Sequence, residues 1–155
     1  MIVGLQVHST AAEPASFTRL VPTHPKVIAA ATAFPGGGHN AENILKPPAP
    51  NGHRADYASH GLAAKTFIDF DLGRPERVAA FRHIQRRTPD TIAEANLLFS
   101  DTADFQNVLA SVKIQHVDEP GATTFAAFAP VTARYVRWQV TSVLPGRSPN
   151  VGGQG

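Results

Sequence analysis

Two stretches of the sequence concentrate side chains that could bind a polar or anionic ligand. Residues 36–61 are rich in Gly, Pro, Asn and His, and a loop of that length in a compact domain is usually functional. Residues 82–87 place three arginines and a histidine near the end of an expected strand, where guanidinium groups could pair with a carboxylate or a sulfate. The candidate ligand-binding residues are His39, Asn40, His53, Arg54, Tyr57, His60, Arg86 and Arg87.

Several of these candidates also have an ordinary structural interpretation. Tyr57 could pack in the core beneath the loop, and His60 could be held by backbone groups. Arg86 and Arg87 could be a solvated pair at a strand end. Trp138 is a possible stacking platform, but it alternates with valines at 136 and 140, which indicates the core instead.

Catalysis has less support than binding. The chain has no cysteine nucleophile, no Gly-x-Ser-x-Gly elbow, no phosphate-binding loop and no histidine spacing typical of catalytic zinc. Asp69 and Asp71 share one face of an expected strand, about 7 Å apart, a separation that would suit an inverting glycosidase. Solvated carboxylates on a strand are far more common, so we expect no enzyme activity, although a catalytic domain could exist outside this chain.

Composition limits the other function classes. The 155 residues suit one domain, and 43% hydrophobic with 17% charged residues is typical of a globular chain. No apolar run reaches the roughly 18 residues of a membrane-spanning helix, and residues 1–8 are too short for a signal peptide. The net charge of +2 is small for a nucleic-acid partner. We therefore expect neither membrane insertion nor nucleic-acid binding.

The chain predicts an all-β architecture that would position the candidate residues. Residues 1–25 form an irregular lead-in, and residues 41–45 contain at most a turn of helix. Short alternating runs separated by Gly and Pro turns indicate an antiparallel β-sandwich or jelly roll. The expected strands cover residues 27–33, 65–72, 77–87, 95–99, 107–116, 123–127 and 134–143.

Two blocks have the clearest strand pattern. In the first, Ile68, Phe70 and Leu72 share one face, Asp69 and Asp71 share the other, and Gly73 with Pro75 is expected to stop the strand. In the second, Val136, Trp138 and Val140 alternate with Arg137, Gln139 and Thr141. Both blocks predict half-buried strands that supply the core.

Five blocks in order carry a family resemblance. They are Asn43-Ile44-Leu45, Tyr57-Ala58-Ser59, Phe67–Pro75, Phe99-Ser100-Asp101 and Ala133–Trp138. Over roughly residues 26–155 the sequence resembles the discoidin, or coagulation-factor type C, domain, whose bacterial relatives include the family 32 carbohydrate-binding modules. The resemblance implies a single β-sandwich jelly roll of the galactose-binding-domain type over residues 1–155.

The sequence departs from that family at three places that matter, one of which is Tyr57, where the family usually has a tryptophan before the serine. The family often holds a structural calcium after its Asn-x-x stretch, but here Lys46 follows Asn43-Ile44-Leu45 and puts a cation where an anion is wanted. We therefore expect no metal or cofactor. The family also ends on a strand that we do not find at residues 151–155, so either that strand is missing or Ile2–His8 fills an edge position.

The resemblance implies a non-catalytic carbohydrate-binding module, extracellular or periplasmic, that holds an associated activity near a glycan. The partner would be an oligo- or polysaccharide, and the basic pI of about 9.3 favours an acidic one, such as a uronate or sulfated glycan. The alternative from a different class is a protein–protein adhesion or assembly module of the same fold. In that case the Pro-rich residues 9–26 could contact a neighbouring domain or subunit.

Overall fold

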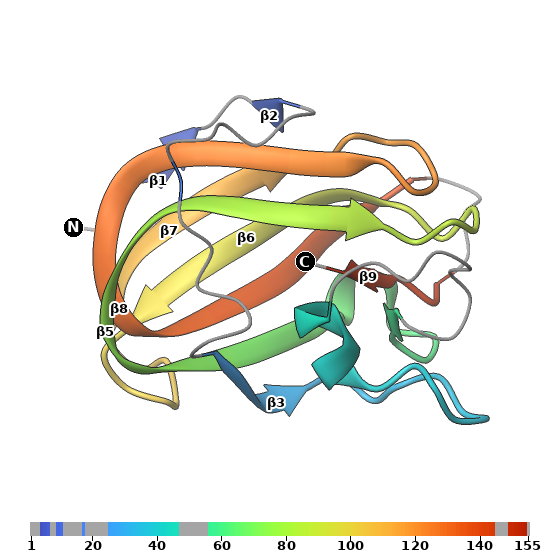
Figure 1. Cartoon of the computed structure of the whole chain (residues 1–155), viewed down its shortest axis with the longest axis horizontal. Helices are drawn as coiled ribbons and strands as arrows, with labels where there is room; N and C mark the ends of the chain where they lie inside the picture. Colours follow the sequence, from blue (N-terminus) through green and yellow to red (C-terminus); the bar gives the residue numbers. More distant parts are fainter. Residues whose placement is uncertain are drawn as a thin grey trace.

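The computed structural model describes residues 4–6, 9–10, 17, 25–46, 56–144 and 149–154. This part of the chain is an antiparallel β-sandwich with two short 3₁₀ helices, as the sequence predicted (Figure 1). No helix within it is long and apolar enough to cross a membrane. The elements are β1 Gly4–Gln6, β2 Ser9–Thr10, β3 Lys26–Ala30, η1 Ala41–Leu45, β4 Tyr57–Ala58, η2 Ala63–Lys65, β5 Phe67–Gln85, β6 Ile92–Ser100, β7 Val108–Gln115, β8 Thr123–Val143 and β9 Gly152–Gln154.

Two long strands organise the sandwich. β5 has 19 residues and β8 has 21, and they pair with each other from Phe67↔Gln139 to Ile84↔Thr123. Both curl over at the same end of the molecule and continue into the opposite layer (Figure 1). The sequence analysis expected a stop at Gly73 and Pro75, and this was wrong. Gly73 adopts a positive φ of 83°, the register shifts between Asp71 and Glu76, and the strand bends instead of ending.

The remaining strands complete the two layers on either side of this pair. One layer runs from β3 through the first half of β5 and the second half of β8 to β6, β7 and β1. The other contains β2, the first half of β8, the second half of β5, β9 and β4.

A short strand lies within residues 151–155, where the sequence analysis found none, and another lies within Ile2–His8. β9 is present as a three-residue strand between β5 and β4. β1, from within Ile2–His8, pairs parallel with the outer side of β7, at the edge position considered for it.

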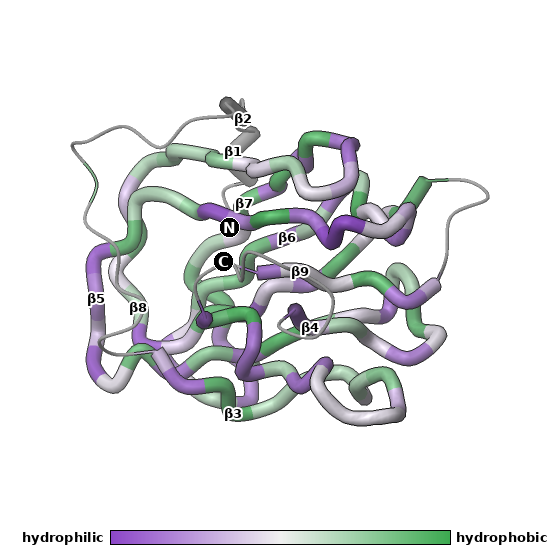
Figure 2. Tube along the Cα trace, turned by 45° about the vertical axis from the view of Figure 1, so that its right-hand side comes forward, coloured by the Kyte–Doolittle hydropathy of each residue, from purple (hydrophilic) through white to green (hydrophobic). Residues whose placement is uncertain are grey.

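The core lies between the layers and is formed by the inward faces of the predicted strands. Ile68, Leu72, Val136, Trp138 and Val140 are buried, as their alternation predicted, whereas Phe70 of the same set is only half-buried against this core. Leucine, isoleucine, valine and phenylalanine side chains of β6 and β7 complete the same cluster. Along β5 the colour turns hydrophilic at the bend (Figure 2), where the strand leaves the core.

Candidate functional site

Both candidate stretches reach the same end of the sandwich. Residues 31–40, 59–66 and 86–91 gather where the second half of β5 ends (Figure 1, right), and we call this the loop end. Backbone hydrogen bonds tie the first two of these segments together. Phe34 N–H donates to Ala58 O at 2.8 Å, and His60 N–H donates to Thr32 O at 2.8 Å. The loop end is therefore held by backbone contacts between segments that are distant in sequence.

An exposed aromatic side chain lies at the loop end between two histidines. Phe34 is 39% exposed, and its ring centroid lies 6.1 Å from that of His39 and 5.7 Å from that of His60, both edge to face. Residues 36–38 are glycines with φ between 76° and 103°, a region that L side chains rarely adopt. They let the chain turn back after Phe34, so that His39 contacts the Phe34 ring. We call Phe34, His39 and His60 the aromatic shelf.

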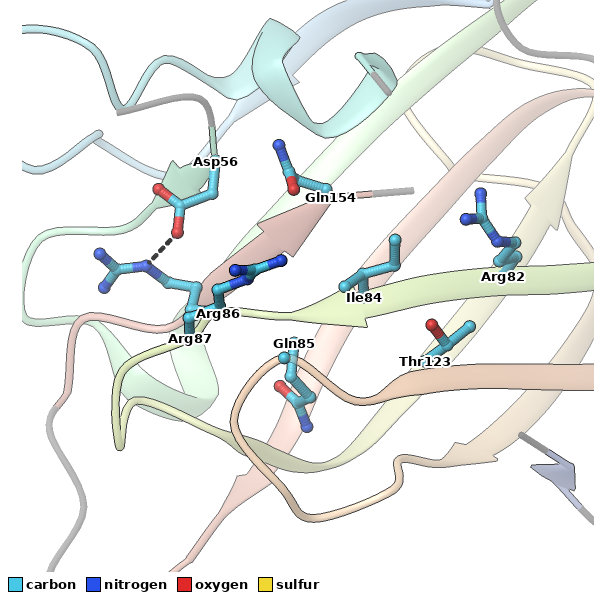
Figure 3. Close-up of a pocket in the computed structure, with 9 residues that line it drawn as sticks. Asp56, Arg82, Ile84, Gln85, Arg86, Arg87, Thr123 and Gln154 are labelled. Atoms are coloured by element: carbon cyan, nitrogen blue, oxygen red, sulfur yellow. Dashed lines mark hydrogen bonds and ion pairs between the residues drawn. The ribbon is translucent and has the colours of Figure 1, made fainter. Parts of the chain in front are cut away.

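A pocket of about 310 Å³ opens where β5, β8 and β9 meet Asp56. Asp56 and Arg86 lie at one side of it, Arg82 and Thr123 lie at the other, and Ile84 lies between them (Figure 3). Its lining contains three arginines and one carboxylate, so its charge is positive. We call it the arginine pocket. Its lining residues are Asp56, Arg82, Ile84, Gln85, Arg86, Arg87, Gly121, Thr123 and Gln154.

Asp56 connects the shelf to the pocket. Its Oδ1 lies 2.8 Å from Nδ1 of His39, and its Oδ2 accepts a hydrogen bond from Nε of Arg86 at 2.8 Å. Nη1 of Arg86 donates to Oδ2 of Asp90 at 2.7 Å, and that same oxygen accepts from the Thr88 hydroxyl. The side chains of Asp56 and Arg86 are almost completely buried, so the chain of contacts is shielded from water.

The predicted binding residues of the loop have different environments. His39 and His60 belong to the aromatic shelf, and Asn40 is exposed just before η1. Tyr57 is fully buried, its hydroxyl donates to Ala31 O at 2.8 Å, and burial raises its pKa. That is the core position considered as its alternative, and it leaves no exposed atom for a ligand. His53 and Arg54 lie outside the described residues.

The two predicted arginines also differ from each other. Arg87 is exposed and lines the arginine pocket. Arg86 lines it too, but its Nε and Nη1 are already bound by Asp56 and Asp90, and Nη1 also donates to Asn150 O. Arg87 is therefore the better placed of the two for an incoming anion.

Sequence reasoning missed two residues of the loop end. Phe34 was assigned to the end of an expected strand, although an aromatic residue directly before Pro-Gly-Gly-Gly was a signal that could have singled it out. Asp56 lies within the candidate stretch 36–61 but was not among the predicted binding residues. Its partners are 17 and 30 residues away in the sequence, and no local pattern reports such contacts.

The residues around Asn43 do not fit the structural calcium of the resembling family. Oδ1 of Asn43 accepts a hydrogen bond from the Lys46 ammonium at 2.8 Å, so a positive charge already occupies the position beside that oxygen. Nδ2 of Asn43 donates to the backbone oxygens of Gly38 and Asp56. Across the described ranges, no group of three or more His, Cys, Asp or Glu side chains could hold a metal ion.

The paired carboxylates of β5 are not arranged for acid–base chemistry. Asp69 accepts two hydrogen bonds from Arg137, at 2.6 and 2.8 Å, and Asp71 accepts two from Arg134, both at 2.9 Å. The Arg137 guanidinium also lies over the rings of Phe67 and Phe105. Hydrogen bonding from Arg134 lowers the pKa of Asp71, so this carboxylate is a poor proton donor.

A second histidine cluster lies in the core, apart from the loop surface. The rings of His83 and His116 are 4.6 Å apart, and His83 also stacks on Trp138 at 5.3 Å. Burial lowers the pKa of His83 to about 4, and it lowers the pKa of His116 well below its usual range. Both rings are therefore neutral at neutral pH, and neither offers a surface for a ligand.

No protein family model matches the sequence, and no curated protein matches it either. Solved structures do resemble the fold. The family 32 carbohydrate-binding module from Streptococcus pneumoniae EndoD has a TM-score of 0.58 and 16% identity, covering 89% of this chain and all of that one. The C-terminal domain of a chitobiase from Bacteroides fragilis has a TM-score of 0.62 and 15% identity, covering 85% of this chain and 90% of that one.

A third structure is a sugar complex. The lectin domain of lectinolysin, bound to Lewis B antigen, has a TM-score of 0.58 and 13% identity, covering 88% of this chain and 95% of that one. These similarities show that the chain has the discoidin-like β-sandwich fold of carbohydrate-binding modules, as the sequence resemblance implied. At such low identity they show the fold alone.

Proposed function

We propose that the chain is a non-catalytic carbohydrate-binding module that binds an acidic polysaccharide at its loop end. The observation that carries this proposal is that Asp56 joins the aromatic shelf, whose Phe34 ring is exposed, to an arginine-lined pocket. The similarity to carbohydrate-binding modules and to a lectin domain supports it.

The shelf has the chemistry to bind a sugar ring. The exposed face of Phe34 can cover the apolar C–H side of a pyranose, and the flanking imidazoles can bond its hydroxyls. His39 and His60 are the predicted residues that perform this role. Asn40, beside His39, adds an exposed amide to the same surface.

The pocket has the chemistry to bind an acidic substituent. Asp56 and Asp90 both pair with Arg86, whereas Arg87 is exposed and also lines the pocket. Its planar guanidinium can bind a carboxylate or a sulfate through two hydrogen bonds. A uronate or sulfated residue beside the sugar on the shelf would place its anion there.

The biological role follows from the same proposal. Neighbours of this fold are modules or terminal domains named as parts of a chitobiase and of EndoD. We propose that this domain likewise holds an associated activity near a glycan, in an extracellular or periplasmic location.

Affinity electrophoresis on polysaccharides that differ only in charge tests the proposal. We expect polygalacturonate to retard the protein, and its methyl ester, which has the same backbone without the charge, to retard it at least tenfold less. Chondroitin sulfate and unsulfated chondroitin form a second pair, which distinguishes a sulfate preference from a carboxylate preference.

Arg87→Ala should weaken binding to the acidic member of either pair about tenfold, which is about 1.4 kcal/mol. Arg74→Ala is the matched control, because it removes another exposed arginine at the bend of β5, far from the loop end. Equal losses in the two variants would mean non-specific charge attraction. Retardation by none of the polysaccharides would overturn the proposed function.

A further inference from the structure

We infer that Asp56 is a positioning residue that sets the specificity of the aromatic shelf, because it fixes which ring nitrogen of His39 carries the proton. The inference rests on the proposed function for its consequence in glycan binding, but the state of His39 can be measured without any glycan. Nothing in the sequence pattern marks Asp56 for this role.

The direction of the Asp56–His39 hydrogen bond follows from the other partner of Asp56. Arginine offers only donors, so Oδ2 of Asp56 accepts from Nε of Arg86. A carboxylate held by a guanidinium is ionised and can only accept, so Oδ1 must accept from His39 as well. The proton between them therefore belongs to Nδ1 of His39.

Further hydrogen bonds fix Asp56 and Arg86, so the two carboxylate oxygens of Asp56 cannot exchange partners. Nδ2 of Asn43 donates to Gly38 O at 2.6 Å and to Asp56 O at 3.2 Å, which ties the backbone before His39 to the backbone of Asp56. Arg86 is fixed in turn by Asp90 and by the backbone oxygen of Asn150. Asp56 is thus anchored at its main chain and at both carboxylate oxygens.

The consequence for the shelf is a defined acceptor. With the proton on Nδ1, Nε2 of the neutral imidazole can only accept a hydrogen bond. Nε2 makes no hydrogen bond within the described part of the chain, and the ring borders Phe34. The shelf should therefore select a glycan residue that presents a donating hydroxyl beside the face that stacks on Phe34.

Asp56→Asn should reverse this arrangement without changing the shape of the side chain. Nε of Arg86 still needs an acceptor, so the amide oxygen of the new side chain must face Arg86. Its NH₂ group then faces Nδ1 of His39, which can accept from it only without a proton. The proton moves to Nε2, and the shelf presents a donor where it presented an acceptor.

Long-range ¹H–¹⁵N NMR of the histidine rings at about pH 8, where an ordinary imidazole is neutral, tests the inference directly. We expect the proton of His39 on Nδ1 in the unsubstituted protein and on Nε2 in Asp56→Asn. Asp104→Asn is the matched control, because it neutralises an exposed carboxylate in the β6–β7 connection and should leave the His39 signals unchanged. A proton on Nε2 in the unsubstituted protein would overturn the inference, even if Asp56→Asn failed to fold.

Binding then tests the consequence. On polygalacturonate gels we expect Asp56→Asn to bind at least tenfold more weakly than Asp104→Asn, although both lose one negative charge and the acidic polymer should favour that loss. A changed tautomer with unchanged binding would remove Asp56 from any role in specificity. If the unsubstituted protein bound no polysaccharide, the proposed function would fail while the NMR result still decided the state of His39.

Discussion

Arginine–carboxylate pairs occur both on the strands and at the loop end, but they are arranged differently. On the strands, Asp69 gives both oxygens to Arg137, and Asp71 gives both to Arg134. At the loop end, Asp56 divides its oxygens between His39 and Arg86, and Arg86 continues to Asp90. The strand pairs are closed units, whereas the loop-end residues form an open chain.

This difference shows where a change in the charge of one side chain can affect the hydrogen bonds of another. A two-point pair satisfies both partners, so its loss is felt as lost stability at that place. A carboxylate shared between two unlike partners couples them, because altering either side changes what the other can donate or accept. We therefore expect substitutions on the strands to alter stability and substitutions at the loop end to alter binding.

The largest expected effect is a loss of unfolding free energy at acidic pH, caused by histidines buried between the strands. His83 has a pKa of about 4 in the folded chain, because burial disfavours its charged form, and about 6.5 when unfolded. Between these values the unfolded chain binds more protons, so the free energy of unfolding falls as pH drops from about 6.5 to about 4. The expected loss from His83 is about 3 kcal/mol, and His116 adds to it.

Urea unfolding followed by the fluorescence of Trp138 at several pH values measures this loss. His83→Gln, which removes the titrating group, should flatten the pH dependence. His60→Gln, which removes an exposed histidine, should leave it unchanged. The same slope in His83→Gln would mean that other groups cause the acid sensitivity.

Asp69→Asn should have the next largest effect. The substitution leaves the Arg137 guanidinium against Phe67 and Phe105 without its counter-charge, which should cost about 2–3 kcal/mol of unfolding free energy. Glycan binding should stay unchanged, because Asp69 lines neither the shelf nor the pocket. Chemical denaturation and affinity electrophoresis of the same variant check both parts, and weakened binding in a folded variant would contradict the separation of the two regions.

Phe34→Ala should have the opposite outcome, with weaker glycan binding and nearly unchanged stability. Loss of the exposed ring should weaken binding to polygalacturonate about tenfold, or about 1.4 kcal/mol, while the unfolding midpoint stays nearly constant. Ile28→Ala is the matched control, since Ile28 on β3 is a similarly exposed apolar side chain at 46%. Isothermal titration calorimetry compares the two, and equal affinities would exclude Phe34 from the site.

Asp71→Asn should have the smallest effect. Arg134 is well exposed, so solvent screens its pair with Asp71, and the stability change should be much smaller than that of Asp69→Asn. About 1 M salt should abolish the effect of Asp71→Asn and leave most of the effect of Asp69→Asn. Equal changes in both variants at high salt would show that exposure does not separate the two pairs.

The core could be predicted from the sequence because it obeys a local rule. Alternation with a period of two identified six core residues, of which five are buried and Phe70 is half-buried against them. The turn of helix expected at residues 41–45 is the 3₁₀ helix η1. The continuity of β5 was not predicted, because Gly73 and Pro75 usually end a strand, whereas here the pairing with β8 resumes at Glu76 after a register shift.

The sequence indicated which segments form the loop end, but it did not indicate which of their side chains contact one another. Composition indicated residues 36–61 and 82–87, yet the roles within them depend on contacts between distant segments. Tyr57 and Arg86 have the right chemistry for a ligand, but one is fully buried and the other is already paired. Whether a polar side chain is free to bind is decided by its neighbours in space, and one sequence does not state those.

The passage of β5 and β8 through both layers also determines how the molecule can open. A sandwich whose layers are joined only by turns can lose one layer first, but here either layer can detach only if both long strands break in mid-course. We therefore expect the amides of both halves of β5 and β8 to share one slow hydrogen-exchange rate, set by global unfolding. Their pairing joins residues up to 72 positions apart, from Phe67 to Gln139, so folding has to close a long loop and should be slow.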